Sequence, residues 1–556
     1  MLAFSSCICA IGNANEITVS QSATALNAMV VTDHALASKV GLEVLQQGGN
    51  AVDAAVAIAY ALAVVEPCCG NIGGGGFMLI REKNGKNCFI NFREKAPLAA
   101  NSSLYEEKST DTNNSKTGFL AVGVPGTVLG LETALKRYGT KSRAQLMQPA
   151  IQLAENGFVL TNADIDMLSP ETKAFKQEAN VATIFLKNGK PYKAGDRLVQ
   201  LQLAHTLKLI AKEGAKVFYQ GIIADKIVSA SRKQGGILSK ADFEKYQVEM
   251  LQPLHCRYRD FEIMTAPLPS SGGIVLCEAL NILEAYPLSQ LGADSILAKH
   301  YTIEAMKFAF ADRSKLGDPN FVTNPTEFLI SKEYAEGLQQ KINPDFASSA
   351  SELRNSMSNS EGDNTTHFSV IDKEGNIVAL TYTLNSLFGA HVIAGDTGFF
   401  LNNEMDDFTI REHVPNQFGL VQGTANNIEA EKRPLSSMSP TIVLKNNNPL
   451  LILGAAGGPN IITANLLTLI NVLDYKMALK NAVNAPRFHH QFLPDEVEAE
   501  QGAFNPVLAK ELQKRGHRIV PHKRLGIEEA IYIDPRTKEI NGVSDRRRPA
   551  GKAVGF

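Results

Sequence analysis

Apolar residues follow two rhythms along this chain. In several long stretches they recur every three or four positions, which is the spacing of a helix with one buried face. The first two stretches, 35–47 and 51–65, are separated by Gly48-Gly49-Asn50, a helix-ending signal, so we expect two helices packed as a hairpin. The same spacing predicts further helices over residues 129–138, 144–156, 200–213, 222–234, 274–285, 298–315 and 461–473.

Elsewhere apolar and polar residues alternate, which is typical of strands. The alternation over 366–370 and 377–381, on either side of Lys373-Glu374-Gly375-Asn376, predicts a β-hairpin. Residues 88–93 and the apolar run 450–453 predict further strands. There is no internal repeat or heptad run, and 556 residues could form two or three average domains or one large layered α/β unit.

A glycine-rich run, 70–76, comes just before the strand-like segment 77–80. It lacks the GxGxxG pattern of dinucleotide sites, and it does not link a strand to a helix. We therefore interpret it as a place of close backbone packing, which glycine permits because it has no side chain.

Residues 345–364 break both rhythms, because they are mostly Ser, Asn, Glu, Gly and Asp. This composition buries little and predicts an exposed loop, where a chain is readily cut. A cut before Thr365 would leave a threonine that carries its own base, since an α-amino group has a pKa of roughly 7.7–8.0 and is substantially neutral near pH 7–8. That amine can take the hydroxyl proton while the hydroxyl attacks a carbonyl. An isolated Asn-Thr pair, however, is most simply a loop that ends at a strand.

Longer motifs around this point are more specific. They are Thr365-Thr366-His367-Phe368-Ser369-Val370, 375–385, Phe388-Gly389, Leu401-Asn402-Asn403-Glu404-Met405-Asp406-Asp407-Phe408, 432–440 and Gly457-Gly458, with Phe92-Arg93-Glu94 upstream. Together they resemble the signature of the γ-glutamyltranspeptidases, over nearly the whole chain apart from its first residues. That family consists of self-cleaving enzymes whose nucleophile is an N-terminal residue. The resemblance implies an α+β fold, the four-layer αββα sandwich of the N-terminal-nucleophile hydrolases.

The resemblance also implies a division of the chain. A cut between Asn364 and Thr365 would give a large chain, 15–364, and a small chain, 365–556, that carries the nucleophile. The two chains would remain associated as a heterodimer and form one αββα unit.

Roles at the site follow from the positions that match the family. Thr365 would be the nucleophile, hydrogen-bonded by Thr383. Arg93 would bind the substrate α-carboxylate, a task suited to its planar fork of donors, although one arginine without this context is more simply a surface ion pair. The remaining implied roles are the α-ammonium site of Asp407, assisted by Glu404 and Asn385, further substrate contacts from Ser436 and Ser437, and an oxyanion hole made by the amides of Gly457 and Gly458.

The acidic segment 404–407 and the loop 414–420 each allow a more detailed prediction. Asp406 and Asp407 are adjacent acids, and on an extended chain adjacent side chains point to opposite faces, so only one of them should face the site. Some family members have glutamine in place of Glu404. Residues 414–420 match the lid loop that some members possess, and Phe418 stands where an aromatic gate is often found. A phenylalanine can cover the site but lacks the hydroxyl of a tyrosine; an ordinary surface loop is the alternative.

Composition excludes several classes of partner. Hydrophobic residues make up 44% and charged residues 20% of the chain, and the formal net charge is -2, so nothing draws it to nucleic acid or to an anionic membrane. The most apolar helical run, 54–65, is too short for the ~20 residues that span a bilayer. Residues 1–14 resemble a secretory leader with a small-residue cleavage site but without a positive N-terminal region, and Phe4-Ser5-Ser6-Cys7 loosely resembles a lipoprotein cleavage box. We expect a periplasmic or secreted protein.

Cysteine, histidine and arginine clusters suggest little further chemistry. Five cysteines remain after the leader, without CxxC or Cys/His spacing, and buried small hydrophobes are the default interpretation, an isolated disulfide being the alternative if the protein is exported. His367, His489 and His490 lack metal-site spacing, and no GxSxG motif is present, so we predict structural histidines and no metal or other cofactor. The run Arg546-Arg547-Arg548 is most simply a solvated face.

The implied activity is transfer of a γ-glutamyl group. Thr365 would attack glutathione or another γ-glutamyl compound, and water or the amine of an amino acid or peptide would take the acyl group. Two alternatives stay open: an amidase of the same class acting on another acyl group, such as a cephalosporin side chain, and an inactive exported binding protein that is never cut. An α-amino acid clamp of Arg93 and Asp407 argues against the first.

Overall fold

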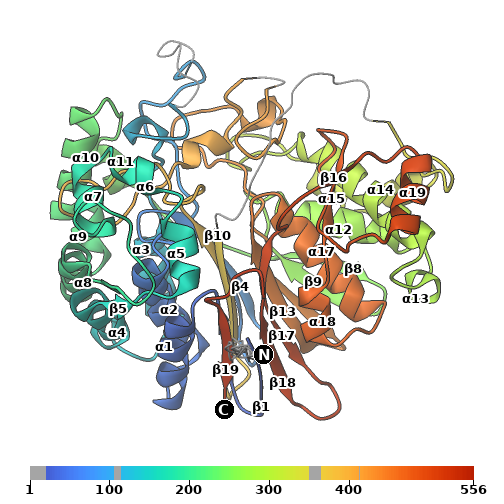
Figure 1. Cartoon of the computed structure of the whole chain (residues 1–556), viewed down its shortest axis with the longest axis horizontal. Helices are drawn as coiled ribbons and strands as arrows, with labels where there is room; N and C mark the ends of the chain where they lie inside the picture. The colour runs from blue at the N-terminus through green and yellow to red at the C-terminus, as the bar shows by residue number, and fades with distance from the viewer. Residues whose placement is uncertain (1–20, 106–113, 350–364, 412–413) are drawn as a thin grey trace, which may run out of the picture.

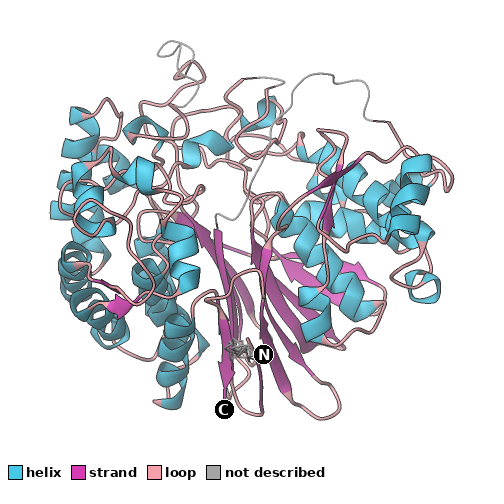
Figure 2. Cartoon of the chain, viewed as in Figure 1, coloured by secondary structure: helices cyan, strands magenta, loops and turns pink. Residues whose placement is uncertain are grey.

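A computed structural model of the chain describes residues 21–105, 114–349, 365–411 and 414–556. Two seven-stranded sheets lie face to face at its centre, and helices cover their outer faces (Figures 1 and 2). One sheet has the order β19 (Lys552–Gly555), β2 (Met29–Thr32), β10 (Thr365–Ile371), β11 (Ile377–Thr383), β3 (Gly75–Arg81), β4 (Asn87–Asn91) and β7 (Glu249–Leu251). The other has the order β1 (Ser22–Ala25), β18 (Ile540–Ser544), β17 (Ile527–Ile533), β13 (Asn448–Ala456), β12 (Thr441–Lys445), β9 (Phe261–Thr265) and β8 (Leu254–Tyr258).

The helices form two outer layers. On the side of β10 lie α1 (Ala35–Gln46), α2 (Ala51–Val65), α3 (Thr127–Tyr138), α4 (Arg143–Asn156), α8 (Leu201–Glu213) and α10 (Ile222–Lys233), on the left in Figure 1. On the side of β13 lie α12 (Gly272–Leu283), α14 (Ile296–Arg313), α17 (Asn460–Leu473), α18 (Leu479–Asn484) and α19 (Pro506–Lys514), on the right. The fold is therefore the expected αββα sandwich, and the predicted helices are confirmed to within about two residues at most of their ends.

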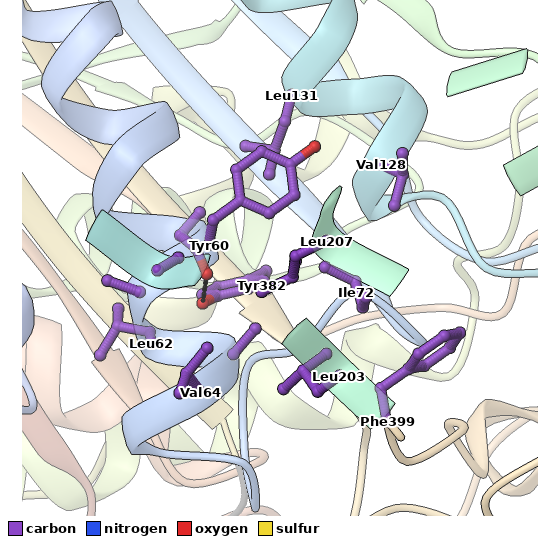
Figure 3. Packing of buried hydrophobic residues seen from close by; sticks show 14 of the residues in the cluster. Tyr60, Leu62, Val64, Ile72, Val128, Leu131, Leu203, Leu207, Tyr382 and Phe399 are labelled. Carbon is purple, nitrogen blue, oxygen red and sulfur yellow. Dashed lines mark hydrogen bonds between the residues drawn. The ribbon is translucent and has the colours of Figure 1, made fainter. Parts of the chain in front are cut away.

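Helix α2 illustrates how local sequence sets these bounds. Asn50 and Asp53 form a capping box, in which each side chain accepts a hydrogen bond of 2.9 Å from the backbone N–H of the other. Every residue of the helix is buried, because it lies between the sheet and its neighbouring helices. Figure 3 shows the core at this layer, where the Tyr382 hydroxyl from β11 donates to the carbonyl of Ala59 at 3.0 Å.

The predicted hairpin is present and lies in the middle of its sheet. Strands β10 and β11 pair antiparallel with Thr365 opposite Thr383, and all their residues are buried. Phe368 and Val370 pack with the helical layer, whereas Ile371 packs between the two sheets. Because β10 also pairs with β2, and β11 with β3, residues on both sides of position 364 build one continuous sheet.

The glycine-rich run packs as predicted against neighbouring backbone. A Cβ on Gly73 would lie 2.0 Å from the carbonyl oxygen of Phe400, and one on Gly74 would lie 1.8 Å from that of Thr383. No larger residue fits there without moving the chain that carries Thr383.

Most of the cysteines follow the alternative interpretation, and the prediction for the arginine run is wrong. Cys256 and Cys277 form a disulfide that joins β8 to α12, and Cys68 and Cys69 form one between neighbouring residues, so only Cys88 is free among the described cysteines. The segment 546–548 is not a solvated face. Arg547 and Arg548 have largely buried side chains and bind acidic partners, Glu500 and Asp545 for the first and Glu66 for the second.

Within the described ranges, no helix combines the length and the apolar character needed to cross a bilayer. The proposed leader lies outside these ranges.

Candidate active site

Thr365 opens β10, and the pairing of that strand places its side chain. Its Oγ1 lies 3.2 Å from Oγ1 of Thr383 on the neighbouring strand, and Thr365 is 4% exposed. The next residue, Thr366, points the opposite way, where its hydroxyl accepts from the N–H of Gly70 at 3.0 Å and donates to Glu66 at 3.1 Å. The start of the strand is thus held from both of its faces. Asn364 lies outside the described residues.

Ten of the residues implied by the resemblance meet around one small cavity. Its lining includes Arg93, Thr365, Thr383, Asn385, Glu404, Asp407, Phe418, Ser436, Ser437 and Gly458. Gly457 directly precedes Gly458 between β13 and α17. The accessible volume is about 20 Å³, enough for about one water molecule, so a γ-glutamyl group can enter only if the covering residues move.

Arg93 lies two residues beyond the end of β4 and is surrounded by carboxylates. Its Nη1 contacts Glu404, its Nη2 donates to Asp407 Oδ2 at 2.5 Å, and Glu94 Oε2 lies 3.6 Å from Nη1. The remaining Nε–H donates to the carbonyl of Pro434 at 3.2 Å. The guanidinium is 1% exposed, so its orientation is set by these partners.

Burial shapes the protonation of this cluster. Burial alone would lower the pKa of Arg93, but the carboxylates of Glu404, Asp407 and Glu94 raise it above its ordinary value. Burial raises the pKa of Glu94 to about 7 and that of Glu404 well above its usual range, although Arg93 opposes both shifts. At neutral pH the cluster therefore retains a proton, and Arg93 is not faced by three full negative charges.

Asp406 and Asp407 do face different ways, but for a different reason from the one predicted. They belong to a 3₁₀ turn, η2 (Glu404–Asp407), and not to an extended segment. Asp407 points to Arg93 and the cavity, whereas Asp406 accepts hydrogen bonds from the Ser115 hydroxyl at 2.6 Å and the N–H of Gln417 at 3.0 Å. In a 3₁₀ turn successive side chains are about 120° apart, which also separates neighbours.

The two serines sit on a loop anchored by the segment before α12. The N–H of Ser436 donates to the carbonyl of Pro269 at 2.9 Å, and its own carbonyl accepts from the N–H of Ser271 at 2.8 Å. Asn385 has a left-handed backbone with φ of 79°, and its N–H donates to Thr383 Oγ1 at 2.8 Å. Thr383 therefore links the start of β10 to Asn385, the residue expected to assist ammonium binding.

Gly457 and Gly458 lie where β13 ends and α17 begins, next to the positive end of that helix. Gly458 has φ of 56°, and a Cβ there would lie 3.0 Å from the ring of Phe418. Phe418 lines the cavity and is held by Asn416 Oδ1, which accepts from its N–H at 3.0 Å, and by Gln491, which donates to its carbonyl at 3.0 Å. Residues 412–413 of the loop lie outside the described chain.

The three predicted structural histidines do not come together. His367 lies between the sheets and contacts Thr381 Oγ1 at 2.7 Å, while His489 contacts Thr463 Oγ1 at 2.9 Å. His490 pairs with Asp495. Two other clusters in the described chain come close enough to hold an ion, Glu66 with Cys68 and Cys69, and His300 with Glu304 and His517. Neither lines the cavity, the two cysteines are joined in a disulfide, and His300 and His517 are hydrogen-bonded to each other at 2.8 Å.

Sequence reasoning assigned no role to two buried charges at the site, Glu94 and Arg313. Glu94 adjoins Arg93 in the Phe92-Arg93-Glu94 motif, and this motif was the only sequence feature that could have marked it as a site residue. Arg313 ends α14 and lines the cavity, but it belongs to an ordinary amphipathic helix pattern that marks no site.

Comparison with known proteins identifies the family of the chain. The chain matches the family Gamma-glutamyltranspeptidase over residues 37–555. It is 49% identical over 542 residues to a glutathione hydrolase proenzyme of Pseudomonas sp. (strain A14), which covers 95% of this chain and 94% of that protein. It is 44% identical over 533 residues to a glutathione hydrolase proenzyme of Escherichia coli (strain K12), and this alignment covers 95% of this chain and 92% of that protein. Its fold is similar to that of a cephalosporin acylase from Bacillus halodurans, with a TM-score of 0.86 and 26% identity over 99% of both chains. On the family match and these identities, the chain belongs to the γ-glutamyltranspeptidase family.

Proposed function

We propose that Thr365 is the nucleophile through which this γ-glutamyltransferase and glutathione hydrolase acts. The observation that carries the proposal is the meeting, in one cavity, of a strand-opening threonine with a buried arginine and a carboxylate that can hold the two charged ends of an amino acid. A cut between Asn364 and Thr365 would divide the chain into 15–364 and 365–556. Both parts contribute strands to the same sheet, which supports their association after cleavage.

In the proposed chemistry, the free α-amino group of Thr365 takes the proton of its own hydroxyl while Oγ1 attacks the γ-carbonyl of the donor. The resulting oxyanion is stabilised by the amides of Gly457 and Gly458; such a donor is typically worth roughly 2.7–4 kcal/mol in the transition state. The ammonium then gives its proton to the leaving amine, and a γ-glutamyl ester remains on Thr365. Water or the amine of an amino acid or peptide attacks this ester and restores the hydroxyl.

The same hydroxyl serves in processing. In the uncut chain Thr365 Oγ1 attacks the carbonyl of Asn364, the peptide bond becomes an ester, and water releases the large chain. The Thr383 hydroxyl, 3.2 Å away, orients the nucleophile in both reactions.

Substrate selection rests on the charged pair in the cavity. Arg93 binds the α-carboxylate, and Asp407 binds the α-ammonium with help from Glu404 and Asn385. Ser436 and Ser437 contact the same carboxylate end from the opposite loop. Phe418 covers the site and moves aside for entry, because the closed cavity holds no more than about one water molecule.

An acylase acting on another acyl group is the second candidate, favoured by the fold similarity to the cephalosporin acylase. Such an enzyme would not need the pair formed by Arg93 and Asp407. The two are distinguished by comparing a γ-glutamyl anilide with a glutaryl anilide, which has the same chain length but no α-amino group. Preference for the glutaryl compound would favour the acylase.

The direct test joins processing to activity. We expect mass spectrometry of the purified protein to find a fragment that begins at Thr365, and Thr365→Ala to remain a single chain of about 60.2 kDa without activity on the γ-glutamyl anilide. Thr365→Ser is the matched control and should retain processing and part of the activity. Arg93→Lys should be cut normally but show a raised KM. Full activity of Thr365→Ala would refute the proposal, and an uncut wild-type chain would favour an inactive binding protein.

We also propose export to the periplasm or the medium. The leader 1–14 lies outside the described residues, but the disulfide between Cys256 and Cys277 supports an oxidising compartment, since disulfides persist there. N-terminal sequencing of the large chain from the exported fraction would test this, and a chain that begins at Met1 would contradict it.

A further inference from the structure

Arg313 is a second buried guanidinium in the cavity. It is the last residue of α14, it lines the same space as Thr365 and Arg93, and it is 3% exposed. Unlike Arg93, it comes from the helical layer behind β13 and approaches the cavity from a different element. The two arginines therefore reach one cavity from different elements.

The donors of Arg313 are mostly uncommitted. Its Nη1 donates to Gln422 Oε1 at 2.8 Å, a neutral acceptor, and its Nε is buried without a hydrogen-bond partner. In the described part of the chain, Arg313 has no carboxylate within ion-pair distance, whereas Arg93 has three. A buried guanidinium with free donors is costly unless an anion reaches it.

The charges around Arg313 favour a bound anion. Burial lowers its pKa to about 10, Asp407 opposes that shift and Arg93 adds to it, so Arg313 is still charged at neutral pH. Asp407 is already bound to Arg93 Nη2 at 2.5 Å. All three carboxylates beside this pair contact Arg93, and none of them lies within ion-pair distance of Arg313, so a further anion in the cavity has a guanidinium available to it.

The surroundings of Arg313 also connect it to the ammonium site. Gln422, which accepts from Arg313, donates through Nε2 to the carbonyl of Asp407 at 2.7 Å. Asn426 donates to the same carbonyl at 2.7 Å, and its Oδ1 accepts from the N–H of Leu435, next to Ser436. Arg313 is therefore fixed relative to the backbone of Asp407 and to the serine loop.

We propose that Arg313 is a substrate-binding residue that shares the α-carboxylate of the γ-glutamyl donor with Arg93. The inference rests on the proposed function of the site and adds to it a specificity-determining residue. The carboxylate lies between the two guanidiniums, and the α-ammonium beside it reaches Asp407. A donor without an α-carboxylate leaves both guanidiniums without their shared anion.

The test compares two substrates that differ only in this group. They are a γ-glutamyl anilide and the 4-aminobutyryl anilide, which keeps the amine and the scissile amide but lacks the α-carboxylate. For Arg313→Met we expect kcat/KM on the γ-glutamyl anilide to fall about 10- to 100-fold, mainly through KM, as expected for loss of a hydrogen-bonded charge. Activity on the 4-aminobutyryl anilide, measured with stoichiometric enzyme, should change less than about twofold. Arg313→Lys keeps the charge but not the planar fork of donors. Its loss of kcat/KM should be smaller than that of Arg313→Met and should appear only with the γ-glutamyl anilide.

Each alternative gives a different result. Equal losses on both substrates would assign Arg313 a structural role in holding Gln422 and would overturn the inference, as would unchanged kinetics. If Arg313→Met is not cut into two chains, the same two-substrate comparison is made with Arg313→Lys, and its result decides whether Arg313 binds the substrate. The proposed function fails separately, if the wild-type protein has no γ-glutamyl anilide activity or if Arg93→Lys leaves KM unchanged.

Discussion

Replacing Thr383 with valine tests the geometry of the proposed nucleophile, Thr365, most directly. Valine has nearly the same shape as threonine, so the variant removes a hydroxyl from β11 and little else. That hydroxyl lies 3.2 Å from Thr365 Oγ1 and accepts from the N–H of Asn385 at 2.8 Å. Thr383 is 3% exposed, so water cannot readily take its place.

The magnitude follows from these two hydrogen bonds. Loss of the neutral contact to the nucleophile removes about 0.5–1.5 kcal/mol, which lowers kcat about 2- to 13-fold at about 1.36 kcal/mol per factor of ten. The buried N–H of Asn385 loses its partner as well, which costs about 1–3 kcal/mol of stability. KM should rise less than kcat falls, because Arg93 and Asp407 are untouched. Self-cleavage should slow by a similar factor, since the same hydroxyl assists both reactions.

The assay is steady-state hydrolysis of a γ-glutamyl anilide, with the fraction of cut chain followed by electrophoresis. Thr383→Ser is the matched control, because it restores the hydroxyl, and we expect its kcat to be within about twofold of wild type. If Thr383→Val processes and turns over at the wild-type rate, the hydroxyl does not orient Thr365 and the proposed geometry is wrong.

Three further predictions concern the oxyanion loop, a buried histidine and a disulfide. Gly458→Ala should lower kcat, because an alanine with φ of 56° costs about 1–2 kcal/mol and its Cβ would lie 3.0 Å from the Phe418 ring. Adding Phe418→Ala should restore part of the lost kcat, and no recovery would contradict the steric cause. Burial lowers the pKa of His367 to about 3, so the folded state does not take up the proton that the unfolded state binds below pH 6.5, and stability falls as pH drops. Between pH 7.5 and 5.5 this loss of stability amounts to about 1.4 kcal/mol. His367→Gln should remove that loss from the pH dependence of urea unfolding, measured in a processing-deficient background, and an unchanged pH dependence would contradict the prediction. Replacing Cys256 and Cys277 by serine opens a loop of 21 residues and should cost about 3 kcal/mol in the same unfolding assay, whereas unchanged stability would show that the bridge does not constrain the chain.

Local signals were sufficient to predict the elements that position the site. Helix α2 was predicted with its observed ends because Gly48-Gly49-Asn50 stops the preceding helix and the apolar spacing resumes directly after it. The β10–β11 hairpin was predicted because its alternation and its turn residues are both local. Such signals depend only on residues a few positions apart, and the chain satisfies them whatever its tertiary structure.

The assembly of the site depends on contacts that no local pattern encodes. Arg93 and Asp407 are 314 residues apart, and only the resemblance brought them together in advance. The 3₁₀ turn at Asp407 was missed because its pattern is too short to distinguish from an extended segment, and Cys256 and Cys277 lack a diagnostic spacing. Arg313 was missed because its burial arises from packing of α14 against the lid loop, which its helix does not reveal.

The resting cluster gives a physical reason why an amino acid with both charges should be preferred. Arg93 and Asp407 neutralise each other at 2.5 Å in the closed cavity, where the side chain of Arg93 is 1% exposed and that of Asp407 is 13% exposed. A ligand carrying only a carboxylate would separate Arg93 from Asp407 and leave Asp407 without a partner, whereas a ligand carrying only an amine would compete with Arg93 for Asp407 and supply no new anion to Arg93. Removing one partner of a buried pair typically costs about 3–5 kcal/mol. A zwitterion replaces one internal ion pair with two external ones and leaves no charge unpaired. On this argument, specificity arises less from the strength of either contact than from the cost of satisfying only one of them.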